Sequence, residues 1–170
     1  MKGTFRRIFI RIYRALKRWE QSDRYESIKK KYEIHPSFRF NGEGILIYGD
    51  GNLVIGENSY IGGYSTIQIS KGYTVRIGKN CRISHNVRIY TSSFAPDQDF
   101  SNFKGLAKHS GDIVIQDNVW IGANAFLNPG VTIGENAIIG ANSVVTKDVE
   151  AFGIYGGVPA KLIRYKTKDA

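Results

Sequence analysis

Three histidines are the residues of this chain best suited to take up a proton near neutral pH, because imidazole titrates in that range: His35, His85 and His109. A histidine of this kind can act as a general base that takes the proton from a substrate hydroxyl. His85 and His109 lie 24 residues apart and Cys81 is the only cysteine, so the sequence shows no local ligand pair for zinc. We therefore expect proton transfer and no metal site.

The elements that must position these histidines follow a six-residue period. From residue 115 an aliphatic residue recurs every six positions, and a small or β-branched residue follows four positions after each one. The aliphatic positions are Ile115, Ile121, Leu127, Ile133, Ile139 and Val145, and the small positions are Val119, Ala125, Val131, Ala137, Ser143 and Val149. The aliphatic positions recur upstream at Ile55, Ile61, Ile77, Ile83 and Ile89, and the period breaks at 68–76 and 92–112.

A period of six fits neither an α-helix nor an ordinary strand. It predicts an all-β solenoid in which three six-residue sides complete one triangular coil, with the aliphatic and small positions pointing inward. Asn recurs three positions after the aliphatic residue, where its tolerance of left-handed backbone suits a corner: Asn58, Asn80, Asn86, Asn118, Asn124, Asn136 and Asn142. Cys81 falls in a small inward position, so we interpret it as a core residue rather than a nucleophile.

Residues 1–40 form a separate segment whose first part is basic and amphipathic. Residues 1–31 contain 11 Lys or Arg against three acidic residues, which accounts for +8 of the net charge of +9. Apolar residues recur at helical spacing: Phe5, Ile8, Phe9, Ile12, Tyr13, Leu16 and Trp19. Two interpretations stay open, a helix that caps the open end of the solenoid and a peripheral membrane contact through residues 1–20.

The remaining residues, 41–170, are nearly neutral, so we expect no nucleic-acid partner. No run of 18 apolar residues and no secretion signal occurs, and we expect a cytoplasmic protein. Residues 92–112 lack the repeat and predict a protruding functional loop. Asp97 and Asp99 in this loop are candidates to orient a histidine or bind substrate hydroxyls, or they are solvated loop carboxylates.

Two sequence stretches resemble the hexapeptide-repeat acyltransferases, above all the bacterial polysaccharide, maltose and serine O-acetyltransferases. They are NVWIGANAFLNPGVTIGENAIIGANSVVTKDV, which begins at Asn118, and GGVPAKLIR, which begins at Gly156. The resemblance covers about residues 55–165. It implies a left-handed parallel β-helix with an N-terminal α-helical segment, and a homotrimer with active sites between subunits. It also implies acetyl transfer from acetyl-CoA to a hydroxyl of a sugar or glycan.

The resemblance also implies which residues bear the site. In maltose-type relatives the base lies at the start of the loop, where this chain has Phe94, which cannot accept a proton. His85 instead matches the position of the catalytic histidine in serine and sialic-acid O-acetyltransferases, and His109 is a second candidate for the base or a substrate contact. Positions matching the pantetheine groove are Trp120, Gly122, Ala123, Gly140 and Ala141, and those near the coenzyme phosphates are Lys147, Lys161 and Arg164.

Three alternatives remain at the level of sequence. One is acetylation of an amino sugar nitrogen by the same donor. Another is a zinc hydratase of the γ-carbonic-anhydrase kind, which shares this coil but needs three converging histidines. The third is a non-catalytic scaffold, an alternative that Phe94 keeps open.

Overall fold

The computed structural model describes residues 2–101 and 105–167, and the chain divides into two compact units. The first unit, Met1–Tyr32, is built on a single helix, α1 (Lys2–Lys31). The second unit, Glu33–Ala170, contains every strand. Among the described residues, no helix is both long enough and apolar enough to cross a membrane.

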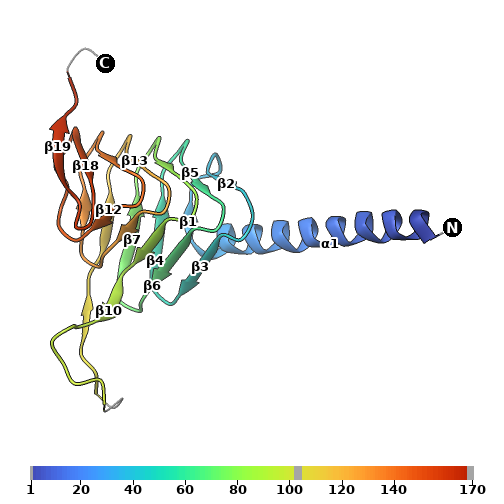
Figure 1. Ribbon diagram of the computed structural model, residues 1–170, viewed down its shortest axis with the longest axis horizontal. Helices are drawn as coiled ribbons and strands as arrows, with labels where there is room; N and C mark the ends of the chain where they lie inside the picture. The colour runs from blue at the N-terminus through green and yellow to red at the C-terminus, as the bar shows by residue number, and fades with distance from the viewer. Residues whose placement is uncertain (1, 102–104, 168–170) are drawn as a thin grey trace. The chain divides into compact units, whose positions relative to one another are not determined.

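The strands of the second unit form three parallel sheets that are the three sides of a solenoid of about five turns (Figure 1). Face A consists of β1 (Glu33–Ile34), β4 (Asn52–Ile55), β7 (Thr74–Ile77), β12 (Ile113–Ile115) and β15 (Thr132–Ile133). Face B consists of β2 (Arg39–Asn41), β5 (Tyr60–Gly62), β8 (Arg82–Ile83), β13 (Trp120–Ile121), β16 (Ile138–Ile139) and β18 (Gly153–Gly156), with β19 (Lys161–Tyr165) antiparallel at its end. Face C consists of β3 (Leu46–Gly49), β6 (Thr66–Ile69), β9 (Arg88–Tyr90), β14 (Phe126–Leu127) and β17 (Val144–Val145). The predicted all-β solenoid is confirmed.

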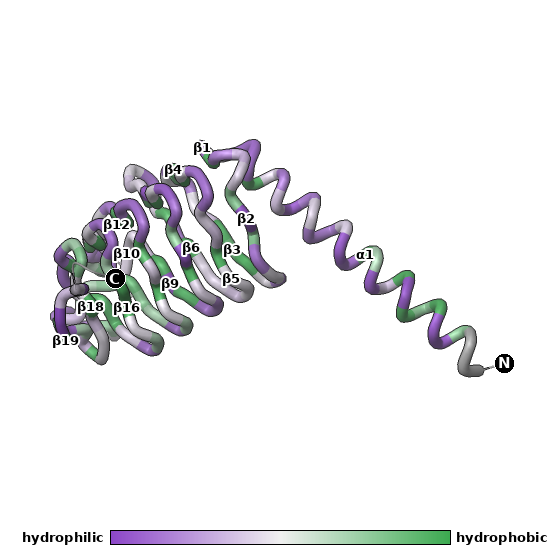
Figure 2. Tube along the Cα trace, turned by 90° about the horizontal axis from the view of Figure 1, so that it is seen from above, coloured by the Kyte–Doolittle hydropathy of each residue, from purple (hydrophilic) through white to green (hydrophobic). Residues whose placement is uncertain are grey.

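The core of the solenoid is made by the inward positions of the six-residue repeat. The six aliphatic positions from Ile115 to Val145 are at most 1% exposed, and the small positions from Val119 to Val149 at most 4%. Parallel register places like on like, so that Ile83, Ile121 and Ile139 stack in successive coils of face B. Figure 2 shows these coils stacked one after another. Each buried aliphatic side chain contributes about 1.5–3 kcal/mol relative to an exposed one, which explains why the repeat is strict.

The corners follow the predicted asparagine pattern. All seven asparagines of the pattern adopt positive φ, between 54° and 61°. Their side chains bond from coil to coil: Asn86 Nδ2 donates to Asn124 Oδ1 over 2.7 Å, and Asn124 Nδ2 donates to Asn142 Oδ1 over 3.0 Å. These ladders fix the spacing of successive corners.

The first coil begins earlier than the predicted boundary after residue 40. β1 already pairs with β4, and β2 with β5, so residues 33–41 belong to the solenoid. Phe38 occupies the small inward position and Phe40 pairs with Ile61 in the aliphatic position. Aromatic residues replace the repeat consensus at both places, and for this reason the first coil was not predicted.

The predicted loop projects from the solenoid between β9 and β12 (Figure 1). Its stem is an antiparallel hairpin of β10 (Ser92–Phe94) and β11 (Lys108–Ser110), which the sequence did not predict. Gln98 fastens the strand ends beyond the stem, because its Nε2 donates to the carbonyls of Ala95 and Ala107 and its Oε1 accepts from the Ala107 N–H. The hairpin therefore has a defined geometry where it leaves the coil.

Candidate functional site

One corner of the solenoid, between faces B and C, brings His85 into line with two of the predicted coenzyme-binding residues. Register on face B pairs Ile83 with Ile121 and Ile121 with Ile139, so His85, Ala123 and Ala141 occupy the same corner position in three successive coils. The Asn124 N–H donates to the His85 carbonyl over 3.1 Å, and the Asn142 N–H to the Ala123 carbonyl over 2.8 Å. We call this column of three residues the B–C corner column.

The B–C corner column presents backbone donors that the described chain leaves unpaired. The N–H groups of His85, Ala123 and Ala141 have no acceptor among the residues that the structure describes. At the corner between faces A and B, the equivalent N–H groups of Lys79 and Glu135 are taken, at 2.8 Å each, by side-chain oxygens of the next or preceding coil, whereas those of Glu57 and Asp117 also have no acceptor among the described residues. Unpaired backbone donors at a partly exposed corner are available to a ligand or to water.

Glycine keeps this corner open. A Cβ on Gly122 would lie 2.5 Å from the Ala141 nitrogen, and a Cβ on Gly62 would lie 2.5 Å from the His85 nitrogen. Side chains at these positions would therefore obstruct the backbone of the next coil. Gly140 is less constrained, since a Cβ there would lie 3.4 Å from the Tyr155 carbonyl oxygen, close to an ordinary contact distance.

Two of the three predicted phosphate-binding cations lie on one strand, β19, beyond the C-terminal end of the column. Lys161 is registered against Gly156, which stacks on Gly140 in the last coil, and Arg164 is registered against Ile154. Three coil steps of about 4.8 Å each separate His85 from that last coil, a span of about 14 Å. Lys147, the third cation, is exposed and follows β17 at a different corner, between faces C and A.

Trp120 projects from face B, beside the column rather than in it. Its ring is 50% exposed and lines a groove of 530 Å³ together with Tyr60, Arg82 and Lys166. The groove also contains the corner residues Asn80, Asn118 and Asn136, with Ser84 and Ile138. Sequence reasoning missed Arg82 and Lys166, because an outward position of the repeat carries no consensus that distinguishes a ligand-binding cation from a solvated one.

A second cavity, of 320 Å³, lies on face C beside the hairpin. Its walls are aromatic and polar, and comprise Gln68, Tyr90, Ser92, Ser93, Phe94, Lys108 and Phe126. The rings of Tyr90 and Phe126 stack with centroids 5.3 Å apart, and Lys108 Nζ lies 5.7 Å from the Phe94 ring centroid. Gln68 Oε1 is buried and has no hydrogen-bond partner among the residues that the structure describes, so the cavity wall has an acceptor to offer a donor. We call this space the face-C cavity.

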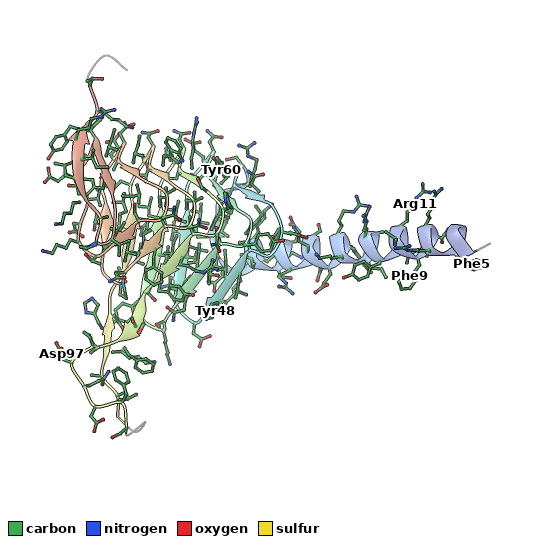
Figure 3. The ribbon with its side chains drawn as sticks, viewed as in Figure 1. Phe5, Phe9, Arg11, Tyr48, Tyr60 and Asp97 are labelled. Atoms are coloured by element: carbon green, nitrogen blue, oxygen red, sulfur yellow. The ribbon has the colours of Figure 1, made fainter. Side chains whose placement is uncertain are left out.

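Tyr48, from the neighbouring strand β3, extends the aromatic surface of face C. Burial, followed by the charge and hydrogen bond of the nearby Tyr90, raises the pKa of the Tyr48 phenol. Figure 3 shows Tyr48 and Tyr60 on different sides of the solenoid, as expected for residues of faces C and B. The two cavities are therefore on different faces.

The loop candidates do not line the face-C cavity. His109 is exposed and lies opposite Ser93 in the hairpin, next to the Phe94–Lys108 pair. Asp97 lies on the projecting loop (Figure 3) and is exposed. The Asp99 carboxylate accepts from the Ser101 N–H and hydroxyl at 2.8 Å each, and these hydrogen bonds lower its pKa.

His85 and the hairpin lie at opposite edges of face C, on either side of strand β9. His85 precedes β9 and the hairpin follows it, so about seven residues, or at most about 23 Å of extended chain, separate His85 from Ser92. His35 lies in the first coil, where its Nδ1 is 2.8 Å from the Ser37 hydroxyl. Among the described residues, no group of three His, Cys, Asp or Glu side chains is arranged to hold a metal ion.

Cys81 is fully buried, as the repeat predicted. Burial raises the pKa of its thiol, and Sγ lies 3.1 Å from the Gln116 carbonyl. A protonated thiol inside the core is a poor nucleophile.

Comparison with known families and proteins identifies the repeat. Residues 112–147 match the family model described as bacterial transferase hexapeptide (six repeats), and residues 52–91 match the hexapeptide repeat of succinyl-transferase. The galactoside O-acetyltransferase of Escherichia coli is 40% identical over 117 residues, which cover 69% of this chain and 55% of that enzyme. The chloramphenicol acetyltransferase of Agrobacterium fabrum is 33% identical over 145 residues, which cover 69% of each protein.

A solved structure extends the match to the fold. The hexapeptide-repeat-containing acetyltransferase of Vibrio cholerae, crystallised with acetyl-CoA, superposes with a TM-score of 0.66 at 26% identity. The superposition covers 86% of this chain and 78% of that one. This chain thus spans little more than half of the Escherichia coli relative but most of the length of the Vibrio structure.

Proposed function

Because this chain belongs to the hexapeptide-repeat acetyltransferase family, we propose that it transfers an acetyl group from acetyl-CoA to a sugar hydroxyl in polysaccharide or glycan biosynthesis. The observation that carries the proposal is the B–C corner column, in which a candidate base and unpaired backbone donors share one edge. A coenzyme arm extended along this edge would reach from the cations of β19 to His85. Since acetyl-CoA is a cytoplasmic metabolite, we place the reaction in the cytoplasm.

His85 is the proposed general base, and the transfer is direct. Its ring accepts the proton of the acceptor hydroxyl while the oxygen attacks the thioester carbonyl. The resulting oxyanion is stabilised by a backbone N–H of the column. Its collapse expels the CoA thiolate, which takes the proton that His85 received from the acceptor hydroxyl. No acyl-enzyme is needed, in agreement with the buried, protonated Cys81.

The coenzyme is assigned to two kinds of group. Backbone donors of Ala123 and Ala141, which follow Gly122 and Gly140 in the sequence, hydrogen-bond the pantetheine amides. Lys161 and Arg164 attract the phosphates, because a charge-assisted hydrogen bond to a phosphate oxygen is strong, whereas Lys147 lies at the corner between faces C and A and is not part of this edge. Trp120 lies on face B beside this corner, but the groove that it lines runs along Asn80, Asn118 and Asn136 of the corner between faces A and B.

The acceptor is assigned to the face-C cavity and the adjoining loop. Stacked aromatic rings and a few polar groups are the usual lining of a small-molecule site, and Gln68 Oε1 is free to accept from a sugar hydroxyl. Asp97 and His109 are proposed contacts at the rim, whereas Asp99 already holds Ser101. The galactoside substrate class of the Escherichia coli relative supports a sugar, and the Agrobacterium relative makes chloramphenicol the second acceptor to test.

A homotrimer would join these two halves of the site. Within one chain the B–C corner column and the hairpin lie at opposite edges of face C, so we propose that the corner of one subunit faces the hairpin of its neighbour. Light scattering of the purified chain should give three times the chain mass of 19.1 kDa. A monomer with full activity would contradict the shared site.

The proposed activity is tested by incubating the full chain with acetyl-CoA and a panel of acceptors. The panel contains galactosides, oligosaccharides, amino sugars and chloramphenicol. We expect CoA release with a sugar, and a product with one acetyl group that hydroxylamine removes, because an ester is cleaved where an amide persists. Products resistant to hydroxylamine would assign the chain to N-acetylation. The proposal would be contradicted if no acceptor of the panel caused release of CoA, or if the chain did not bind the coenzyme.

A further inference from the structure

Helix α1 carries an apolar stripe that is open to solvent from Phe5 to Trp19. We call it the α1 stripe, and its side chains are between 49% and 74% exposed: Phe5, Ile8, Phe9, Ile12, Tyr13, Leu16 and Trp19. Figure 2 shows green, hydrophobic segments alternating with purple ones along this helix. A contiguous exposed apolar surface of this kind usually marks a binding face.

The rest of the helix circumference over the same length is cationic. At 100° per residue, its basic residues fall on the side away from the α1 stripe: Arg6, Arg7, Arg11, Arg14, Lys17 and Arg18. Figure 3 shows Phe9 and Arg11 on opposite sides of the helix. No acidic residue occurs before Glu20, which pairs with Arg24 over 3.3 Å. The acid-free part of the helix therefore ends together with the stripe.

We propose that residues 5–19 of α1 bind the surface of an anionic lipid bilayer. The α1 stripe enters the boundary between headgroups and acyl chains, and the arginine-rich flanks contact lipid phosphates. The aromatic residues Phe5, Phe9 and Trp19 supply rings suited to that boundary, and the net positive charge without internal acids requires an anionic partner. The helix lies on the membrane rather than across it, since it has a charged face throughout its length.

A second copy of the helix is the competing occupant of the stripe. Phe5, Phe9, Ile12, Leu16 and Trp19 follow the spacing of a coiled-coil seam. The next two seam positions, however, are Asp23 and Glu26, so the apolar seam lasts only about two heptads. The flanking positions of this seam hold Arg6, Ile8, Tyr13, Ala15, Glu20 and Ser22, and the one acidic residue among them, Glu20, already pairs with Arg24 of the same helix. The lipid surface is thus the better fit.

The proposal is tested with the full-length chain and sedimenting vesicles. Wild-type protein should bind vesicles of phosphatidylcholine with 30% phosphatidylglycerol at least about tenfold more strongly than vesicles of phosphatidylcholine alone, because several arginines act together on the anionic lipid. A stripe variant, Phe9→Ser with Trp19→Ser, should lose binding to both. A charge variant, Arg11→Gln with Arg14→Gln and Arg18→Gln, should lose only the preference for anionic lipid.

The matched control removes three exposed cations of the solenoid, Lys71→Gln, Arg76→Gln and Lys79→Gln, and should bind like wild type. All variants should keep the wild-type melting temperature and CoA binding. Equal binding by the stripe variant and wild type would overturn the proposal. Loss of trimer mass by the stripe variant with unchanged vesicle binding would assign the stripe to a second copy, and a lower melting temperature with unchanged vesicle binding would assign it to a cap.

Discussion

His85 and Ala123 occupy the same corner position in successive coils, and the residue after Ala123 donates its backbone N–H to the His85 carbonyl over 3.1 Å. This relationship places the only histidine of the repeat beside a backbone donor with no partner among the described residues. Acetyl transfer requires a base and an oxyanion donor at one point. Each prediction below follows from this corner or from the core that supports it.

The asparagine ladder predicts how the corner tolerates substitution. Asn124 has φ of 61° and bonds to Asn86 and Asn142. Asn124→Gly loses these exposed bonds but keeps the backbone relaxed, whereas Asn124→Ala also places a Cβ in left-handed backbone, at about 1–2 kcal/mol. The Ala variant should therefore melt about 2–8 °C below the Gly variant, given about 2–4 °C per kcal/mol at this size. Equal melting temperatures in calorimetry would show that the corner backbone relaxes.

The coenzyme groove predicts a position-specific block. Ala141→Phe should weaken CoA binding at least tenfold, an order of magnitude expected when a bulky ring obstructs a hydrogen-bonded backbone. The matched control is Glu135→Phe, which occupies the same repeat position at the corner between faces A and B and should bind CoA normally. Both residues are exposed, so neither change should lower the melting temperature. Calorimetric titration with CoA separates the two, and equal weakening by both would contradict the placement of the groove.

Direct transfer without an acyl-enzyme predicts that removal of the Cys81 thiol leaves turnover nearly unchanged. Cys81→Ala should keep turnover within about twofold, because the repeat itself places Ala at the equivalent inward positions of later coils, Ala125 and Ala137. Loss of acetyl transfer in this variant would contradict a mechanism without an acyl-enzyme.

Burial of the Cys81 thiol also predicts a pH dependence of stability. Its pKa is raised above the ordinary value of 9.0, so the folded state holds the proton more tightly than the unfolded state. The stability that this thiol contributes is present below pH 9.0 and is lost as the pH rises through the folded-state pKa. Wild-type protein should lose more stability than Cys81→Ala between pH 9 and 11 in urea titrations. The same loss of unfolding free energy with pH in both proteins would contradict this prediction.

His109 predicts a binding effect rather than a catalytic one. The side chain is exposed on the hairpin, beside but outside the lining of the face-C cavity. His109→Ala should therefore raise the acceptor KM several-fold and change kcat by less than about tenfold, the pattern of a group that binds ground state and transition state alike. A fall in kcat at unchanged KM would move the base to the hairpin.

The period of six was sufficient to predict the solenoid, its inward residues and all seven left-handed asparagines. The prediction failed at positions of the repeat that hold residues other than those of the consensus. Tyr64 and Phe152 adopt φ of 60° at corners without asparagine, and Phe38 and Phe40 conceal the first coil. Burial decides the inward position of Phe38, where an aromatic ring satisfies burial without matching the consensus, whereas Tyr64 and Phe152 are exposed corner residues.

The candidate site was less predictable than the fold. The Gly-containing phrase of the repeat occurs at two corners, around Gly122 and around Gly134, and the sequence alone does not distinguish them. They differ because Gln116 Oε1 occupies the Glu135 N–H, whereas no described acceptor reaches the N–H groups of Ala123 and Ala141. This difference depends on side chains one coil away, which only the register reveals.

The most direct test of the account is the turnover of His85→Asn with acetyl-CoA and the best acceptor. We expect kcat to fall by roughly 10²–10⁴-fold, the usual contribution of a general base, and the acid-side decline of the rate to disappear. CoA affinity and melting temperature should stay at wild-type values, because His85 is exposed and lies outside the core. Turnover near wild type in this folded, CoA-binding variant would contradict the central claim that His85 takes the acceptor proton.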